Sequence, residues 1–329
     1  MRKEKIIFLS AEDIRNLVSM KEAIDAVESA FLQLSYGKAV VPMRTTINIQ
    51  EKDATSLIMP AYLPEENQIS LKLINLYNQN PEKGLPLAYS LVILADGETG
   101  KPLAVMDGGS LTAIRTGAAS GVATKYLARE DSSVAAVFGA GVQGRTQLEA
   151  LCNVRDIKKA YVFDISKEKA KTFAEEMGKK LSIPVYVADS YSVLQEVDIL
   201  STATTSKEPV FPPEFIRPGT HINAVGSYKP SGREIPEEIV SKAKLVVDHR
   251  ESCLEEAGDI LIPIKKGLFD ESHIFAEIGE IIAREKPARE NREEITFFKS
   301  VGNAVQDLVT AKIAYEKALR TSTGFTITL

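Results

Sequence analysis

The spacing of apolar side chains changes along the chain. Near the amino terminus apolar positions recur every three or four residues, which predicts helices at 11–17 and 20–36 after a short strand at 5–9. From residue 44 to residue 106 apolar and polar positions alternate, as is typical of half-buried strands. We expect these strands at 44–49, 56–59, 69–76, 88–94 and 102–106. The pattern predicts an α+β domain with a mostly antiparallel sheet.

From residue 134 onward, predicted strands and helices take turns. Strands are expected at 134–138, 159–163, 184–187, 198–203, 221–226 and 244–248, with helices at 145–151, 167–181 and 190–195. This order is typical of a doubly wound parallel sheet. A long helix at 107–128 precedes it, and an apolar-striped helix at 303–319 follows. The fold class is therefore α/β: an α+β domain over 1–128, to which 304–329 return, and a Rossmann domain over 129–303.

A glycine-rich turn lies between the first predicted strand and helix of the Rossmann domain. The apolar run Val134–Phe138 leads into Gly139, Ala140, Gly141, Val142, Gln143 and Gly144. In a dinucleotide fingerprint the first glycine makes the tight turn, the second lets the backbone approach a pyrophosphate, and the third lets helix and strand pack closely. The amides at the helix N-terminus then hold the anion.

An acidic residue follows this loop at the distance that a nicotinamide dinucleotide requires. Asp164 ends the next predicted strand, twenty residues after Gly144, where its carboxylate would accept the ribose 2′-hydroxyl. Because a carboxylate repels a 2′-phosphate, NAD(H) is favoured, while NADP(H) stays open because of Ser166 and Lys167. Ile165 and Ser166 are expected beside the same ribose. The alternative is a Rossmann-like domain whose glycine turn binds no cofactor.

The carboxyl ends of two later strands are further candidates. Ligands bind outside the carboxyl ends of the strands in such sheets. The residues expected there, beside the cofactor, are Thr202, Ala203 and Thr204, and then Val225, Gly226 and Ser227.

Composition excludes several classes of function. The 329 residues suit two domains, with 44% hydrophobic and 26% charged residues. The formal net charge of −5 offers no basic face for nucleic acid, and no apolar run is long enough to span a membrane. Two distant cysteines and three histidines show no metal-ligand spacing. We expect no metal site, no nucleic-acid or membrane partner, and a cytoplasmic location.

Three cations stand among small or apolar residues in the first domain. Arg44 begins a strand, Lys72 lies within the run LKLIN, and Arg115 lies within TAIRTGA. A single cation on a strand usually faces solvent, which is the better interpretation for any one of them alone. Together they make an anion-binding pocket plausible, since the forked guanidinium of arginine suits a carboxylate.

These motifs together resemble the ornithine cyclodeaminase/mu-crystallin family over nearly the whole chain. The resemblance rests on Arg44, on Lys72 in LKLIN, on the segment LTAIRTGAAS at 111–120, on GAGVQG and on INAVG at 222–226. It implies homodimers that share a β-barrel built from the first domains, and a Rossmann domain that binds NAD(P). It also implies that Arg44, Lys72 and Arg115 hold the substrate carboxylate or lie beside it, and that Thr116 contacts the dinucleotide.

One departure separates the activities within this family. In the cyclodeaminases, and in similar archaeal alanine dehydrogenases, an aspartate that acts as acid and base in cyclodeaminases follows INAVG. Here Tyr228 occupies that position, and the pattern GSxxP…RE is more similar to the ketimine-reductase branch, which includes the Δ1-pyrroline-2-carboxylate reductases. Tyr228 could orient a substrate or simply pack at the pocket mouth, and it would be a poor base at pH 7.

The resulting hypothesis is reduction of a cyclic imine by NAD(P)H. Δ1-pyrroline-2-carboxylate would become L-proline, and the six-membered imine L-pipecolate. Lys72, Arg115 and Tyr228 are the expected catalytic residues, and Arg44, Lys72, Arg115, Val301 and Gly302 are expected to line the substrate site. The alternatives are alanine dehydrogenase, ornithine cyclodeaminase, and a crystallin-like protein that binds a small molecule without turnover.

Overall fold

The structure, a computed structural model, describes residues 5–328, which fall into two compact units. One unit comprises the chain up to Arg115 and again from Asn303 onward, and the other comprises Thr116–Gly302. The first division lies inside helix α3 (Gly108–Leu127), whereas the sequence pattern predicts it at the end of this helix, at 128/129. A continuous helix of small and apolar residues carries no linker signal, so the pattern alone does not mark a division within it.

The first unit is built on one seven-stranded sheet. Its strand order is β15-β1-β6-β5-β4-β3-β2, in which β1 and β6 are parallel and all other neighbours antiparallel. This confirms the mostly antiparallel sheet. The elements are β1 (Lys5–Leu9), α1 (Ala11–Leu17), α2 (Met20–Ser35), β2 (Thr45–Ile49), β3 (Ala54–Leu63), β4 (Gln68–Tyr77), β5 (Ala88–Asp96), β6 (Pro102–Asp107), α10 (Ala304–Thr321) and β15 (Phe325–Thr328).

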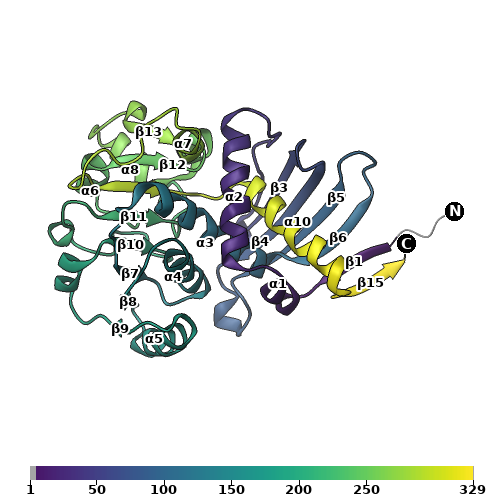
Figure 1. Cartoon of the computed structure of the whole chain (residues 1–329), viewed down its shortest axis with the longest axis horizontal. Coiled ribbons are helices and arrows are strands. Elements are labelled where there is room, and N and C mark those ends of the chain that lie inside the picture. Colours follow the sequence, from purple (N-terminus) through teal and green to yellow (C-terminus); the bar gives the residue numbers. More distant parts are fainter. Residues whose placement is uncertain (1–4, 329) are drawn as a thin grey trace. The chain divides into compact units, whose positions relative to one another are not determined.

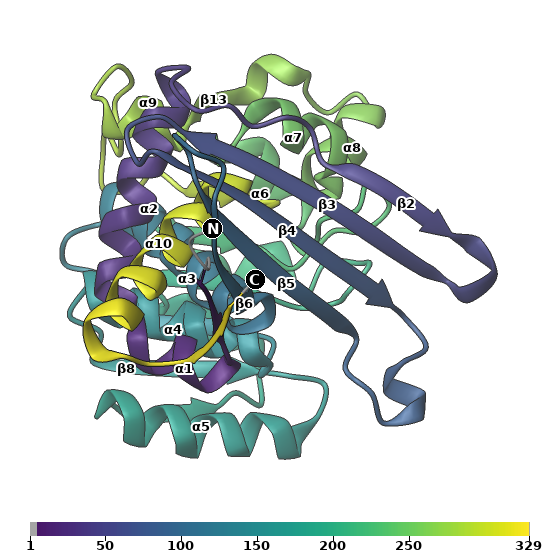
Figure 2. The ribbon, with the colours of Figure 1, turned by 90° about the vertical axis from the view of Figure 1, so that its right-hand side faces the viewer.

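Two helices cover one face of this sheet. Helices α2 and α10 run side by side, and α10 packs on β3, β4 and β5 (Figure 1). Ser19 caps α2 in a reciprocal capping box with Glu22, and the apolar stripe predicted from the sequence is buried. Figure 2 shows the sheet from another side, with the purple α2 and yellow α10 on one side of the strands.

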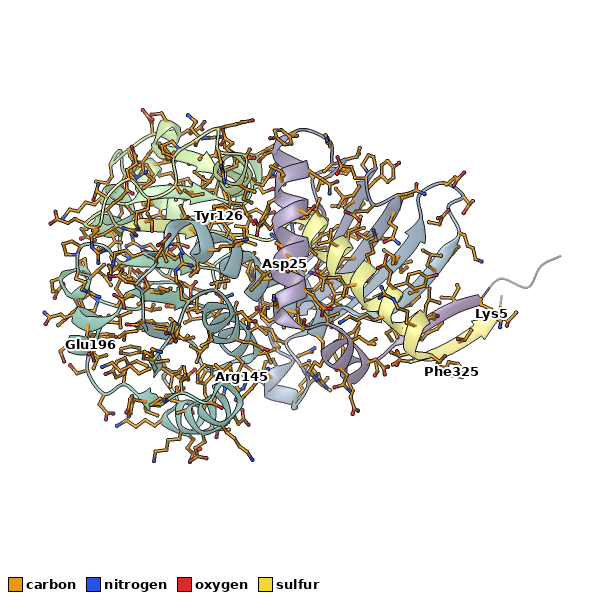
Figure 3. All side chains as sticks on the ribbon, in the orientation of Figure 1. Lys5, Asp25, Tyr126, Arg145, Glu196 and Phe325 are labelled. Atoms are coloured by element: carbon orange, nitrogen blue, oxygen red, sulfur yellow. The ribbon has the colours of Figure 1, made fainter. Side chains whose placement is uncertain are left out.

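The other face of the sheet is apolar and open within this unit. Its exposed apolar side chains are Phe8, Ile47, Ile69, Leu71, Leu73, Tyr89, Leu91, Ile93 and Phe325. The pairing register places several of them in one row across the sheet: Phe325 opposite Phe8, and Ile93 opposite Leu71. Figure 3 labels Lys5 and Phe325, which lie on the paired strands β1 and β15.

The second unit is a parallel sheet with helices between its strands. The strand order is β13-β12-β14-β11-β10-β7-β8-β9, and every neighbouring pair is parallel. The elements are β7 (Val134–Phe138), α4 (Val142–Val154), β8 (Lys159–Phe163), α5 (Lys167–Leu181), β9 (Val185–Val187), β10 (Ile199–Thr202), β11 (His221–Ala224), α6 (Glu237–Lys242), β12 (Lys244–Val247), α7 (Arg250–Glu256), α8 (Gly258–Lys265), β13 (Ile274–Glu277), α9 (Ile278–Ile282) and β14 (Thr296–Lys299). The run β9-β8-β7-β10-β11 has the 3-2-1-4-5 order of a Rossmann fold, which confirms the fold class, and β14, the last strand of the unit in the sequence, takes the sixth place beside β11.

The sequence pattern missed several short elements, although it predicted the equally short strands β9 to β12 from their continuous apolar runs. Strands β13, β14 and β15 have four residues each, and helices α6 to α9 have five to eight. Periodicity needs a longer window than these elements provide. Within the expected elements, α4 begins at Val142, inside the glycine motif, rather than at Arg145.

Candidate functional site

The first unit buries a cluster of two cations and one carboxylate. Lys72 Nζ lies 3.2 and 3.3 Å from the two carboxylate oxygens of Asp307, and Arg115 Nε lies 3.1 Å from Asp307 Oδ1. Arg115 also donates through Nη1 to Gln306 Oε1 at 2.8 Å. Lys72 is 1% exposed, Arg115 6% and Asp307 0%. Two of the three cations singled out in the sequence therefore share one buried anion.

Strand β4 buries Lys72 because its polar side chains, rather than its leucines, face the interior of the unit. Gln68, Ser70 and Lys72 point to the buried face, whereas Leu71 and Leu73 are exposed. The residues paired with Lys72 on the adjacent strands are Met59 and Val92, both buried and apolar. Lys72 is thus held in apolar surroundings, which is an unusual position for a lysine without a functional reason.

Helix α10 brings the counter-charge to this cluster from the far end of the chain. The side chain of Asn303 caps the helix by accepting from the N–H of Val305, and Gln306 and Asp307 lie in the first turn. The positive end of the helix dipole stabilises a carboxylate in this turn. Residues that are 235 positions apart in the sequence, Lys72 and Asp307, thereby become an ion pair.

Burial changes the acid–base behaviour of Lys72. Loss of hydration lowers its pKa to about 8; Asp307 opposes this shift, while the positive charges of Arg115 and Arg44 reinforce it. Arg44 immediately precedes β2 and is half-buried, so its field reaches the same lysine. An ammonium with a pKa near neutral pH can donate and regain a proton readily.

The glycine loop of the second unit has the geometry of a pyrophosphate cradle. Gly139 adopts a φ of +100°, and a Cβ at Gly144 would lie 1.9 Å from the carbonyl oxygen of Gly139. A Cβ at Gly141, the N-cap of α4, would meet no atom within 4 Å. Because no side chain caps this helix, an anion can reach its first N–H groups. The glycine motif thus fits a dinucleotide on structural grounds.

The carboxylate of Asp164 stands at the end of β8 beside this loop. Its Oδ2 accepts the N–H of Ala140 at 2.8 Å, and its Oδ1 accepts the N–H of Ser166 at 2.8 Å. These bonds fix the carboxylate next to the glycine turn. The adjacent Ile165 is fully exposed, and Ser166 caps α5 by accepting from the N–H of Lys169. An apolar side chain held in solvent beside an acidic residue is a suitable contact for an adenosine.

The remaining sequence candidates have definite places in the second unit. Thr116 accepts, through its carbonyl oxygen, a hydrogen bond from Gln147 Nε2 at 3.3 Å. Val301 packs in the apolar core of the unit, and the N–H of Gly302 donates to Asp248 at 2.8 Å. Tyr228 is half-buried, which raises its pKa, so it stays neutral and cannot serve as a base near pH 7.

A carboxylate that the sequence analysis gave no role joins the two later strand ends. Glu234 is fully buried and accepts hydrogen bonds from Thr202, Thr204, Gly226 and Ser227. The candidates at the ends of β10 and β11 are therefore held together by one side chain.

The cysteines and histidines serve structure. Neither Cys152 nor Cys253 is in a disulfide, and burial raises the pKa of Cys152 to about 12. His221 is buried between Thr296 and Asn223, His249 caps α7, and His273 bonds to a backbone carbonyl. Over residues 5–328 no group of histidine, cysteine or acidic side chains could hold a metal ion, and no helix has the length and hydropathy to cross a membrane.

Asp307 and Gln306 are the site residues that sequence reasoning missed. They lie in an apolar-striped helix that was assigned only a covering role. The available signal was a carboxylate and an amide in the first turn of a helix that is otherwise largely apolar on its buried side. No spacing rule connects that turn with Lys72, so the contact required the fold.

Comparisons with known proteins agree with this geometry. The family model "Ornithine cyclodeaminase/mu-crystallin family" matches residues 4–322. A Δ1-pyrroline-2-carboxylate reductase of Bacillus cereus is 41% identical over 97% of this chain and 98% of its own. The structure of the Thermococcus litoralis Δ1-pyrroline-2-carboxylate reductase in complex with NADH and L-proline is 52% identical, with a TM-score of 0.95 over 98% of this chain and 100% of that one.

A second solved structure has a different activity. An archaeal alanine dehydrogenase dimer with bound NAD is 40% identical, with a TM-score of 0.92 over 98% of this chain and 99% of that one. The family assignment holds for either activity, because the family model matches residues 4–322. The chain belongs to the ornithine cyclodeaminase/mu-crystallin family.

Proposed function

We propose that this protein is an NADH-dependent reductase of a cyclic imine, converting Δ1-pyrroline-2-carboxylate to L-proline and accepting the six-membered imine as well. The observation that carries the proposal is the buried cluster of Lys72, Arg115 and Asp307, which holds one more positive than negative charge. A relative that reduces this imine is similar over the full chain, and a solved relative holds NADH and L-proline.

The substrate carboxylate is assigned to the cations of the first unit. A buried site with excess positive charge favours an anion, and the guanidinium of Arg115 offers a planar fork that fits a carboxylate. Arg44 contributes a further charge from the strand edge. Val301 and Gly302 come directly before the segment that carries Gln306 and Asp307, and we keep them as proposed lining residues of this site.

The cofactor is assigned to the glycine loop and the strand ends of the second unit. The loop Gly139–Gly144 would take the pyrophosphate, and Asp164 the adenosine ribose, with Ile165 and Ser166 beside it. Thr202–Thr204 and Val225–Ser227 end the fourth and fifth strands in Rossmann order, where the second mononucleotide belongs. When bound, NADH supplies the hydride for the imine carbon.

The protein's own residues supply the proton and the orientation. Reduction of the imine adds one hydride at C2 and one proton at nitrogen, so a proton donor is required. Lys72 Nζ, with its lowered pKa, holds a proton that can pass to the nitrogen. Arg115 fixes the ring through its carboxylate, and Asp307 keeps both cations in place. Tyr228 stays neutral and is assigned an orienting role.

Alanine dehydrogenase is the second candidate, favoured by the 40% identity to the archaeal enzyme. That reaction reduces an imine made from pyruvate and ammonia, so the same carboxylate-binding and proton-donating groups would serve. Cyclodeamination is disfavoured because Tyr228 stands where the resemblance calls for an aspartate.

Three assays separate these activities. NADH oxidation is followed with Δ1-pyrroline-2-carboxylate and with pyruvate plus ammonium, and ammonia release is measured with ornithine and NAD+. We expect a kcat/KM at least about a hundredfold higher for the cyclic imine than for pyruvate, and NADH used at least as well as NADPH. Faster turnover of pyruvate, or ammonia release at a comparable rate, would overturn the assignment; a clear NADPH preference would overturn the role of Asp164.

We also propose a homodimer through the open face of the first unit's sheet. Monomeric proteins rarely expose so large an apolar patch, and the exposed residues Leu71, Leu73 and Leu91 lie next to one another on paired strands. A structural relative is a dimer. Leu71→Asp combined with Leu91→Asp should convert the dimer to a monomer in sedimentation experiments, whereas Val142→Asp, at a more exposed apolar site on the second unit, should not. A wild-type monomer at micromolar concentration would refute this proposal.

A further inference from the structure

The second unit buries a cluster of three charged side chains that the proposed reaction does not use. Glu234, Asp259 and Lys299 are each inaccessible to solvent. Lys299 Nζ lies 2.7 Å from Asp259 Oδ2, and Asp259 Oδ1 accepts the N–H groups of Glu234 and Ile235 at 2.7 and 2.9 Å. Such a cluster is costly to bury, so it should have a purpose beyond filling the core.

The carboxylate of Glu234 ties two loops together. Its Oε1 accepts the N–H and the hydroxyl of Thr204 at 2.7 and 2.8 Å. Its Oε2 accepts the N–H groups of Gly226 and Ser227 at 2.8 and 3.2 Å, and the hydroxyl of Thr202 at 2.9 Å. Five donors from the carboxyl ends of β10 and β11 thus converge on one side chain.

The two loops approach each other closely around this carboxylate. A Cβ at Gly226 would lie 2.3 Å from the carbonyl oxygen of Thr204 and 2.5 Å from Glu234 Oε1, so only glycine fits there. Lys299 Nζ donates to the carbonyl oxygen of Ser227 at 2.6 Å and secures the second loop from the other side. The arrangement leaves the loops little freedom as long as every acceptor is present.

We infer that Glu234 is a positioning residue for the nicotinamide half of the cofactor, acting through the loops Thr202–Thr204 and Gly226–Ser227. The inference rests on the proposed function for its choice of cofactor. These loops end the fourth and fifth strands of the Rossmann order, which belong to the mononucleotide-binding half opposite the adenosine half. Glu234 touches neither substrate nor cofactor in this assignment; it sets the shape of the loops that do.

The chemistry of the contacts requires a carboxylate rather than an amide. Each oxygen of Glu234 accepts at least one backbone N–H. Oε1 accepts from Thr204, whereas Oε2 accepts from Gly226 and Ser227. A glutamine has one acceptor oxygen and one NH2 group. Whichever way the amide is turned, its NH2 group faces a backbone N–H, so one of the two loops must be released.

The test compares Glu234→Gln with Glu237→Gln, the same change three residues away at a side chain near the surface that pairs with Arg233 and Lys266. NADH affinity is measured by fluorescence, without substrate. We expect Glu234→Gln to weaken NADH binding by about tenfold or more and the control to leave it unchanged. With saturating imine, the variant should also show a lower kcat and a larger isotope effect with 4-deuterated NADH, while KM for the imine changes little.

A second variant keeps the inference testable if Glu234→Gln does not fold. Thr202→Val removes one of the five donors and keeps the shape of the side chain, and it should weaken NADH binding by about threefold. NADH affinity and isotope effect that match the wild type in a folded Glu234→Gln protein would overturn the inference alone. A wild-type protein that does not bind NADH would overturn the proposed function, and the inference with it.

Discussion

Each compact unit buries a cluster of three charged side chains, and the two clusters have opposite composition. The cluster of the first unit has two cations, Lys72 and Arg115, around one carboxylate. The cluster of the second unit has two carboxylates, Glu234 and Asp259, beside one cation, Lys299. Both clusters are buried, so hydration does not explain how their excess charge is tolerated.

The difference lies in what satisfies the excess charge. In the second unit the spare carboxylate, Glu234, receives five hydrogen bonds from loop backbone and hydroxyl groups, so the protein itself completes the cluster. In the first unit the excess is positive, and backbone N–H groups cannot neutralise it. When the protein's own groups neutralise a buried cluster, the cluster can hold those groups in position. When a buried cluster keeps an excess of charge, it can bind a ligand of opposite charge.

Replacing Lys72 by methionine should have the largest effect. The change keeps the length of the side chain and removes the transferable proton, so kcat for imine reduction should fall by about 10² to 10⁴, with NADH affinity unchanged. Lys317→Met, at a half-buried lysine of α10 that pairs with Glu22, is the matched control. A folded Lys72→Met protein with wild-type kcat would show that another group supplies the proton.

Replacing Arg115 by alanine should affect substrate binding next. The loss of a forked carboxylate contact should raise KM for the imine about a hundredfold and leave the NADH dissociation constant unchanged. Arg115→Lys should recover only part of the loss, because an ammonium lacks the fork. Steady-state kinetics with Arg320→Ala, an exposed arginine of the same unit, provides the control. An unchanged KM would place the carboxylate elsewhere.

Replacing Asp307 by asparagine tests whether the first cluster tunes Lys72. The wild-type kcat/KM should be constant below the lysine pKa of about 8 and fall above it, because the ammonium then loses its proton. Asp307 is the group that opposes the lowering of this pKa, so Asp307→Asn should move the falling limb to lower pH. The measurement is a pH profile of kcat/KM for both proteins; superimposable limbs would contradict the role of Asp307.

A buried histidine gives the smallest effect and a contrast to both clusters. Burial lowers the pKa of His221 to about 3, against about 6.5 in the unfolded chain. Between these values the unfolded state binds a proton that the folded state does not, so stability falls as pH falls, by at most about 1.4 kcal/mol per pH unit.

His221→Gln should remove this acid dependence at some cost in stability at pH 7. Urea unfolding at several pH values between 7 and 4 measures the slope, and His273→Gln serves as the control because the ring of His273 is only half-buried. If the free energy of unfolding of the His221→Gln variant depends on pH as steeply as that of the wild type, other groups cause the acid sensitivity.

The fingerprint shows how far local sequence reasoning can reach. Gly139, Gly141, Gly144 and Asp164 are all close in sequence, and their roles follow from a strand, a turn and a helix in fixed order. Their geometry in the structure follows the motif because short-range sterics decide it: a Cβ at Gly144 would meet the carbonyl of Gly139. The long, strongly periodic elements were predicted for the same reason.

The contacts between distant residues were not predictable in this way. Asp307 and Glu234 lie in segments without a spacing signal toward their partners, and only the packing of α10 on β4 and the parallel order of β10 and β11 brings those partners within hydrogen-bond distance. The division inside α3 escaped prediction because an unbroken helix looks the same on both sides of it.

Strand β4 shows what the sequence determines by itself and what the tertiary structure decides. The alternation of Ser70, Leu71, Lys72 and Leu73 determined by itself that leucines and polar residues occupy opposite faces. It did not determine which face is inside, and the usual rule would bury the leucines. The fold buries Lys72 because Asp307 on α10 compensates its charge there, and it leaves Leu71 and Leu73 on an open face. The alternation of residues along the strand determines which side chains share a face. Only the helix that packs against the sheet determines which of the two faces is buried.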